Sequence, residues 1–397
     1  VKNSIQWRYE YDQGGRLTSR SSSLGERHQY IYNSSTGELV RHIYMGNGSS
    51  TSSSTEYTYE AYNSTGERLL TQVSADGGAL TLSYSFDEFY RGADKTAKIS
   101  GGAEIGTHYT YRFDGVSGDE NKRSPIPKRI TQTVKNGSGT QTGELVLKYS
   151  YDSLGNIGTV REGGTERQRY YYDDLNQLIR EDNRDLGKTI VYTYDQGGNI
   201  TGKTEYAYQT GSAVTGTPTA AKTCSYTDSN WKDKLTGYNG NSITYDAIGN
   251  PTGYYNGFSF TWEKGRQLAG AANGTDTVSY VYDHEGRRAE KTANGVTSRY
   301  TYEGDKVLFE RNGDTNLWYY YDGEGSPAAI KVRTVIHPYR KDLQGDITGI
   351  YSGTTGELLV SYVYDAWGKV TAIDEADTGE SAELIELNPY LYRGYRY

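Results

Sequence analysis

Residues 192–200 read Y-T-Y-D-Q-G-G-N-I, and this pattern decides the fold of the chain. Tyr192 and Tyr194 stand two positions apart, which places both rings on one face of a β-strand. Asp195 followed three residues later by Gly198 is typical of a type I turn, with the acidic residue first and the glycine last. The final isoleucine then begins a returning strand. The stretch therefore predicts one β-hairpin.

The same pattern recurs from one end of the chain to the other. Clear further copies start at Tyr9, Tyr149, Tyr170, Tyr280 and Tyr362, and looser ones at Tyr30, Tyr57, Tyr84, Ile243, Tyr300 and Tyr319. Such self-similarity predicts a repeat protein in which each unit buries its face against its neighbours. The repeat-defining turn positions are Tyr11, Asp12, Gly15, Tyr151, Asp152, Gly155, Tyr194, Asp195, Gly198, Tyr245, Asp246, Gly249, Tyr282, Asp283, Gly286, Tyr364, Asp365 and Gly368.

The composition favours an all-β protein made of tandem hairpins. Of the 397 residues, 34% are hydrophobic and 41 are tyrosine, so tyrosine replaces aliphatic residues. A tyrosine ring buries a large apolar face but keeps a hydroxyl that can reach water or a polar partner, which suits thin sheets wet on one or both sides. We therefore do not expect a thick, dry core.

Charge and hydropathy exclude several classes of function. The formal net charge is −8 with both signs interspersed and no basic run, which argues against a nucleic-acid partner. No stretch approaches the roughly 18 apolar residues of a membrane helix. The single cysteine, Cys224, excludes an internal disulfide framework. Because the first repeat begins at Tyr9, we expect an excised piece with any export signal upstream.

Repeat spacing divides the chain softly into three parts. Ser/Gly/Thr tracts at 49–55, 136–142 and 210–220 predict loops at hairpin ends, and the acidic tract 375–387 is the one stretch that predicts a helical turn. The expected parts are divergent repeats with long polar hairpin loops (1–225), regular repeats (226–376) and a terminal segment with a different register (377–397).

One formal match to a phosphate-binding loop is rejected on context. Gly197, Gly202, Lys203 and Thr204 satisfy G-x-x-x-x-G-K-T, a motif that needs a following helix. The match lies across a hairpin turn, and residues 204–208 alternate like a strand. We therefore predict a structural turn, with no cofactor site and no nucleotidase activity.

The other chemistry-bearing residues also favour structural roles. The histidines show no H-E-x-x-H spacing and no cysteine partner, so no metal site is predicted from them: His28, His42, His108, His284 and His337. Acidic residues recur with the repeat, which favours turns over acid–base catalysis: Asp12, Asp152, Asp173, Asp195, Asp246, Asp283, Asp322 and Asp365. Trp262, Trp318 and Trp367 occupy repeat-like positions, which favours packing over sugar stacking. We predict no catalytic residues.

The repeats resemble the RHS (rearrangement hotspot) or YD-repeat family over essentially the whole chain. The resemblance is most specific in the C-terminal half, where the following segments succeed one another in the order seen in RHS-associated core regions of bacterial proteins: ITYDAIGNPTGY (243–254), FTWEKGRQLAG (260–270), YDHEGRR (282–288), KDLQGDITGIY (341–351) and YDAWGKV (364–370). The closing NPYLYRGYRY (388–397) resembles the start of the family's core end, so we expect 377–397 to be its truncated beginning.

This resemblance implies a fold and a role. In the family, hairpins wind into a spiralling, hollow, shell-like β-sheet, and relatives include insecticidal toxin-complex components, polymorphic bacterial toxins, wall-associated proteins and animal teneurins. Toxin members sequester a C-terminal toxic domain and release it by an Asp-dependent self-cleavage in the core end. The chain lacks a D-P-x-G cleavage segment, so the resemblance assigns it neither self-cleavage nor toxicity. A secreted or cell-surface location is implied.

Two functions from different classes remain open. The first is a structural container, not an enzyme, that holds or presents its own cargo domain beyond residue 397. The second is an extracellular module that recognises carbohydrate or another cell surface through its loops and aromatic residues. Strand edges left unpaired at the two ends predict self-association, with Tyr9, Tyr11 and segment 390–397 near the contacts.

Overall fold

The protein is almost entirely β in its computed structural model, which describes residues 5–61, 67–111 and 124–397. These ranges contain 33 strands and one α-helix, α1 (Gly379–Leu387). The helix lies within the acidic tract where a helical turn was predicted. It begins with a capping box in which the Thr378 side chain accepts from the Ser381 backbone amide. The all-β prediction is confirmed.

The strands form two sheets of 19 and 14 members. The first contains β1 (Trp7–Tyr11), β2 (Leu17–Ser22), β3 (Arg27–Tyr32), β4 (Leu39–Met45), β5 (Ser52–Ala61), β6 (Arg68–Ala75), β7 (Leu80–Phe86), β8 (Gly92–Ile99), β9 (Glu104–Thr110), β10 (Arg129–Lys135), β11 (Gln141–Tyr151), β12 (Ile157–Glu162), β13 (Thr165–Tyr172), β14 (Leu178–Asn183), β15 (Lys188–Tyr194), β16 (Ile200–Ala207), β17 (Ala220–Ser225), β18 (Gly237–Tyr238) and β19 (Asn241–Ser242). The second contains β20 (Thr244–Tyr245), β21 (Pro251–Gly253), β22 (Ser259–Glu263), β23 (Gln267–Ala272), β24 (Thr277–Tyr282), β25 (Arg288–Ala293), β26 (Val296–Glu303), β27 (Lys306–Asn312), β28 (Thr315–Tyr321), β29 (Pro327–Val332), β30 (Val335–Lys341), β31 (Ile347–Tyr351), β32 (Leu358–Tyr364) and β33 (Val370–Asp374).

The topology is a continuous meander of hairpins. Within each sheet, every strand pairs antiparallel with the next one along the chain, as β15 does with β14 and β16. A register shift recurs just before the turn, for example between Thr193 and Tyr194. Such a bulge adds local twist and bends the strand. Repeated bends of one sign let a long sheet curve instead of lying flat.

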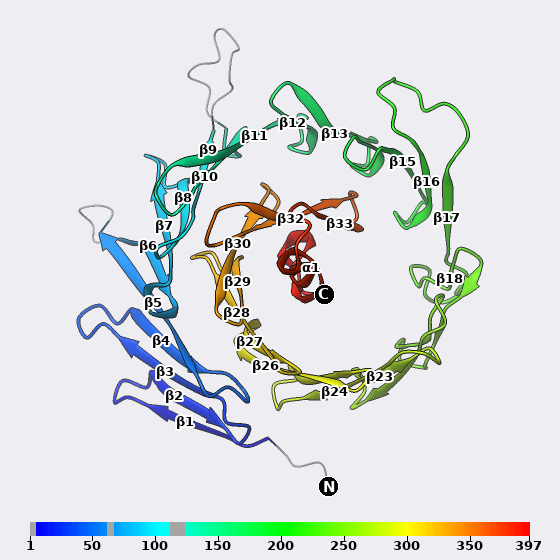
Figure 1. The fold of residues 1–397 in the computed structure, drawn as a ribbon. Coiled ribbons are helices and arrows are strands. Elements are labelled where there is room, and N and C mark those ends of the chain that lie inside the picture. Colours follow the sequence, from blue (N-terminus) through cyan, green and yellow to red (C-terminus); the bar gives the residue numbers. More distant parts are fainter. Residues whose placement is uncertain (1–4, 62–66, 112–123) are drawn as a thin grey trace.

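The meander winds into a spiral that overlaps itself. In Figure 1, the wall runs from blue β1 through cyan and green to the yellow strands β23 and β24. The orange strands β28 to β33 then pass inside the wall formed by β5 to β10, and α1 lies near the centre. The predicted spiral, hollow β-shell is confirmed.

A two-layer core forms where the spiral overlaps, and here the expectation of thin, wet sheets is wrong. On β28, Leu317 and Tyr319 pack on the inner side, whereas Trp318 and Tyr320 pack against the outer wall. The cluster between the layers contains Tyr44, Val73, Ala75, Leu80, Leu82, Leu308, Phe309, Trp318, Tyr320, Ala328, Ala329 and Ile336. Because a second sheet covers one face and α1 the other, these central strands are buried on both sides.

In the repeat motif, the aspartate closes the hairpin turn. Asp152 Oδ1 accepts from the amides of Leu154 and Asn156, both at 2.9 Å, and the Gly155 amide donates to the Asp152 carbonyl at 3.3 Å. Hydrogen bonds from Asn156 hold the pKa of Asp152 below its usual range. Gly155 has φ of 90°, a backbone conformation that side chains with a Cβ rarely adopt.

We expect Gly155→Val to destabilise the protein by about 1 to 3 kcal/mol because valine resists positive φ, and not because of a clash. No atom lies within 4 Å of a Cβ built there. Gly164→Val is the matched control, since that site is equally open but its φ is not positive. Chemical denaturation measures the two costs, and equal losses in both variants would contradict the conformational explanation.

Candidate functional site: the interior wall of the spiral

In most copies of the motif, the tyrosine that precedes the turn joins its hairpin to the hairpin before it. Tyr194 on β15 donates its hydroxyl proton to the Leu178 carbonyl, 2.7 Å away, at the start of β14. Burial raises the pKa of Tyr151, at the same motif position, to about 12, so its hydroxyl stays a donor. The same bond joins Tyr32 to Leu17, Tyr151 to Pro127, Tyr172 to Ile157, Tyr226 to Ile200, Tyr245 to Leu235, Tyr282 to Leu268, Tyr302 to Arg288, Tyr321 to Val307 and Tyr364 to Ile347.

We expect Tyr194→Phe to lower the free energy of unfolding by about 1 kcal/mol, because the ring still packs but the hydrogen bond is lost. Tyr11→Phe is the control, since Tyr11 holds the same motif position but is 62% exposed. Urea unfolding of both variants measures the difference. A Tyr194→Phe protein as stable as the wild type would show that the hydroxyl contributes nothing.

Polar contacts fasten the inner layer to the outer wall. Lys331 on β29 lies 2.5 Å from the Asp76 carboxylate, and Gln132 Nε2 on β10 donates to the Lys341 carbonyl at 2.7 Å. The layers also touch through their backbones, because the Ala103 amide donates to the Gly353 carbonyl at 2.7 Å. Contacts of this kind fix how far one turn of the spiral can slide over the other.

A half-open cavity of about 1040 Å³ lies between β11–β14 on the outer wall and β30–β33 on the inner layer. Tyrosine, aliphatic and charged side chains share its lining, among them Tyr149, Tyr170 and Arg393. Trp367, which was predicted to pack in the shell, instead lines this cavity and is 54% exposed. A hollow of this size with a mixed lining can hold polypeptide side chains.

A buried carboxylate holds the β32–β33 turn against the outer wall. Glu181 on β14 is fully buried and accepts from the Ala366 amide at 2.8 Å and from Asn183 Nδ2 at 2.9 Å. Burial raises the pKa of Glu181 to about 7. Asp346, which lines the cavity, accepts from the Arg393 amide at 2.6 Å. These carboxylates position the inner layer.

The Glu181 environment predicts a pH dependence of stability. Below pH 4.5 the carboxyl is protonated in both states; between 4.5 and about 7 only the unfolded chain ionises, so the free energy of unfolding falls as pH rises. At pH 8, Glu181→Gln should raise the free energy of unfolding by up to about 3 kcal/mol relative to the wild type. At pH 4, the substitution should change the free energy of unfolding little. Denaturation at both pH values, with the exposed Glu10→Gln as control, measures it. A difference independent of pH would contradict the assignment.

The phosphate-loop match forms a turn and a strand, as predicted. Residues 200–207 lie in β16, and no helix follows Gly202. Lys203 is ion-paired with Asp365 across the cavity wall. Of the other tryptophans, Trp318 is buried in the two-layer core and Trp262 Nε1 donates to the Pro251 carbonyl at 2.7 Å. Both have the packing roles that were predicted.

The spacing of residues in the sequence did not reveal one cluster of side chains that could bind a metal ion. His28 on β3, His42 on β4 and Glu303 on β26 place their ligand atoms within 4.8 Å of one another. The two histidines meet across paired strands, and the glutamate arrives from the next turn of the spiral. No local motif can reveal such a cluster. By contrast, His108 lies on an exposed face beside Asp94.

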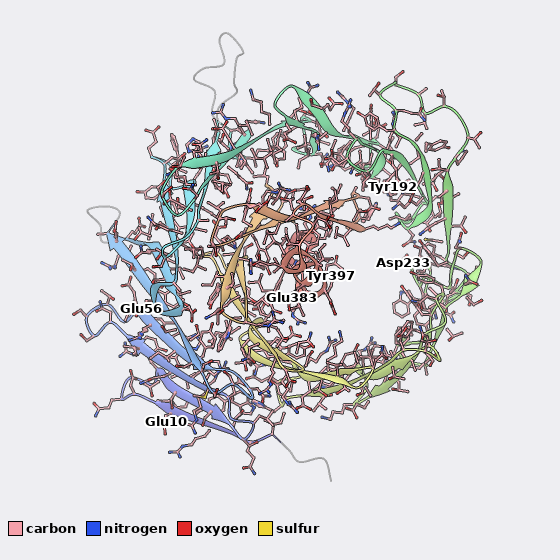
Figure 2. All side chains as sticks on the ribbon, in the orientation of Figure 1. Glu10, Glu56, Tyr192, Asp233, Glu383 and Tyr397 are labelled. Carbon is pink, nitrogen blue, oxygen red and sulfur yellow. The ribbon has the colours of Figure 1, made fainter. Side chains whose placement is uncertain are left out.

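The C-terminal segment lies inside the spiral. Tyr390 is buried, with its hydroxyl 2.7 Å from that of Tyr321, and it pairs with Arg396 in an isolated bridge. Figure 2 shows Tyr397 at the centre of the ring, whereas Glu10 lies on an outer strand. The same chain covers Tyr390, and contacts between copies through segment 390–397 stay a prediction.

Comparison with known sequences gives relatives of one kind, although no family model matches the chain. The tRNA nuclease WapA of Bacillus subtilis (strain 168) is 35% identical over 233 residues, which are 57% of this chain and 9% of that protein. The tRNA3(Ser)-specific nuclease WapA of Bacillus spizizenii is 34% identical over the same shares. The chain thus spans less than a tenth of the length of these relatives.

Solved structures share the fold. The crystal structure of TcdB2-TccC3-Cdc42 matches all of this chain and 25% of its own, with a TM-score of 0.55 and 15% identity. TcdB2-TccC3 without its hypervariable C-terminal region matches 98% of this chain and 25% of its own, with a TM-score of 0.56 and 14% identity. Fold and repeat together define a spiral β-shell of tandem hairpins. In sequence and in fold, the chain is similar to proteins of the RHS, or YD-repeat, kind.

Proposed function

We propose that this chain is part of a container: a spiral wall that encloses a toxin or effector domain attached beyond residue 397. One observation carries the proposal. The chain ends inside the ring formed by its own strands (Figure 2), so a polypeptide that continued from Tyr397 would start in the interior. The outer wall and the inner layer would then surround this polypeptide. The cavity beside Arg393 lies between the same two layers.

The polar groups of the repeat support a wall in place of an active site. One carboxylate oxygen of each motif aspartate accepts hydrogen bonds from two turn amides. Asp246 Oδ1, for example, accepts from the amides of Ile248 and Asn250 at 3.0 and 2.8 Å. Most motif tyrosines donate their hydroxyl to a carbonyl of the neighbouring hairpin, as Tyr282 does to Leu268. We assign the structural role to this chain and any toxic activity to a different part of the protein.

The comparisons are in keeping with this division. The relatives named as tRNA nucleases match over only 9% of their length. The likeness to TcdB2-TccC3 persists when the hypervariable C-terminal region is absent from that structure. A wall shared by proteins with different cargo fits both findings. We propose that the protein is bacterial and acts outside the cell or at its surface. In the described ranges, no helix has the length and apolar character needed to cross a membrane.

Glycan recognition is the second candidate. The Tyr254 and Tyr255 rings are tilted against each other with centroids 4.6 Å apart, and the Tyr255 ring lies 4.5 Å from that of Tyr238, which groups three aromatic rings near β18 and β21. Sugar rings stack on such platforms. A glycan array would support this candidate if the chain bound a specific carbohydrate and Tyr254→Ala abolished the binding.

The container proposal predicts unequal access to the two ends. A protease recognition sequence appended after Tyr397 should be cut at least about tenfold more slowly than the same sequence placed before Val1, because cutting inside requires the wall to open. Gel analysis under native conditions measures both rates, and urea should equalise them. Equal rates under native conditions would contradict enclosure.

A further inference from the structure

A cluster of two histidines and a glutamate lies where the spiral meets itself. His28 and His42 come from the neighbouring strands β3 and β4, and Glu303 ends β26. In sequence the glutamate is more than 260 residues away, but the structure brings it to the two imidazoles because β26 passes this part of the wall one turn later. Tyr30 on β3 donates its hydroxyl to Glu303 at 2.7 Å, which fixes the carboxylate.

The three ligand atoms have the separation of a metal site. His28 Nδ1 lies 2.9 Å from His42 Nε2, and Glu303 Oε2 lies 3.6 Å from the first nitrogen and 3.7 Å from the second. The circumradius of a triangle with these sides is about 2.0 Å, so a single ion near its centre would be about 2.0 Å from all three atoms. Zinc binds imidazole nitrogen and carboxylate oxygen at about this distance.

A second carboxylate orients one of the imidazoles. Glu26 Oε1 lies 2.8 Å from His28 Nε2, the ring nitrogen that faces away from the cluster. When Nε2–H donates to this carboxylate, Nδ1 is left with its lone pair directed at the centre. Metal-binding histidines usually carry such a carboxylate partner, which fixes the tautomer and strengthens the ligand. The His28 and Glu26 side chains are both buried, so the arrangement is held rigidly.

The local charge is compatible with a dication. Arg20 Nη2 lies 3.1 Å from Glu303 Oε2 and 3.4 Å from His28 Nε2, which adds one positive charge near the site. Arg20 also donates to the Tyr302 carbonyl, so its guanidinium is held in place beside the ligands and outside their triangle. The Glu303 carboxylate offsets its charge.

Access is from one side. The His28 and His42 side chains are almost fully buried, whereas the Glu303 side chain is 41% exposed. An ion can enter past the glutamate, and water can take a fourth position there. Two nitrogens and one oxygen suit a borderline ion without a strict geometric preference, which describes Zn²⁺ better than Ca²⁺ or Mg²⁺.

We propose that His28, His42 and Glu303 bind one zinc-class divalent cation, which pins the first turn of the spiral to the strand that passes it one turn later. Two ligands belong to the outer wall and one to the inner course, so the ion joins segments that otherwise meet through side-chain hydrogen bonds. This site is independent of the container proposal, since an ion can bind whether or not the shell holds cargo.

Metal titration tests the site directly. Protein freed of metal with EDTA and then dialysed should bind one Zn²⁺ per chain, bind Co²⁺ with visible absorption bands, and melt at a higher temperature with Zn²⁺ than with EDTA. Glu303→Gln and His42→Gln, which keep side-chain volume and hydrogen bonding, should abolish the binding. Glu26→Gln leaves all three ligands in place and should weaken the binding about 10- to 100-fold.

The control is His108→Gln, which removes an exposed histidine beside Asp94 and should leave binding unchanged. Circular dichroism of each variant checks that the β-structure is intact. If His42→Gln does not fold, Glu303→Gln decides, because that side chain is partly exposed. Failure of the wild type to bind Zn²⁺ stoichiometrically at micromolar concentration, or equal binding by folded Glu303→Gln, overturns the proposal.

Discussion

The fold depends on a hydrogen bond between the tyrosine hydroxyl of one hairpin and a backbone carbonyl of the hairpin before it. In Tyr172 and Ile157, or Tyr302 and Arg288, the donor ends an outgoing strand and the acceptor begins the preceding return strand. The sheet ladder alone would allow neighbouring hairpins to twist and slide. The hydroxyl reaches a carbonyl on the adjacent strand and so adds a side-chain bond to the ladder that holds neighbouring hairpins in register.

The polar groups of the motif are used to build this hairpin geometry. The aspartate is occupied by turn amides and the residue four positions later often returns a second bond to it, as Arg287 does to Asp283 at 2.9 Å. The glycine is required by its positive φ, which is 80° at Gly286. With donors, acceptors and conformational freedom all committed to building the wall, the repeat positions are poor places for reactive groups. Distinct chemistry is found where different turns of the spiral meet.

Local structure could be predicted from the sequence, whereas the contacts between turns could not. Period-two tyrosines and the Asp-x-x-Gly spacing are short-range signals, so the hairpin at 192–200 and its turn follow directly from them. The burial of Phe309 and Trp318 depends on a sheet more than 200 residues away, as does the approach of Glu303 to His28. The spacing between a tyrosine and its carbonyl partner varies from 10 residues in Tyr245 and Leu235 to 26 in Tyr226 and Ile200, so it leaves no fixed pattern in the sequence.

The overlap of one turn of the spiral with the next distinguishes this protein from an open solenoid. In an open solenoid each unit touches only its neighbours, and stability is a sum of local terms. Here Tyr30 contacts a residue 273 positions away, and Lys331 contacts one 255 positions away. These contacts form only after a full turn is complete, and the strands they cover, such as β28, carry apolar side chains on both faces. An isolated inner layer would expose Phe309 and Trp318 to water. The outer wall is therefore a folding requirement for the inner layer, and the interior of the shell exists only because both turns are present.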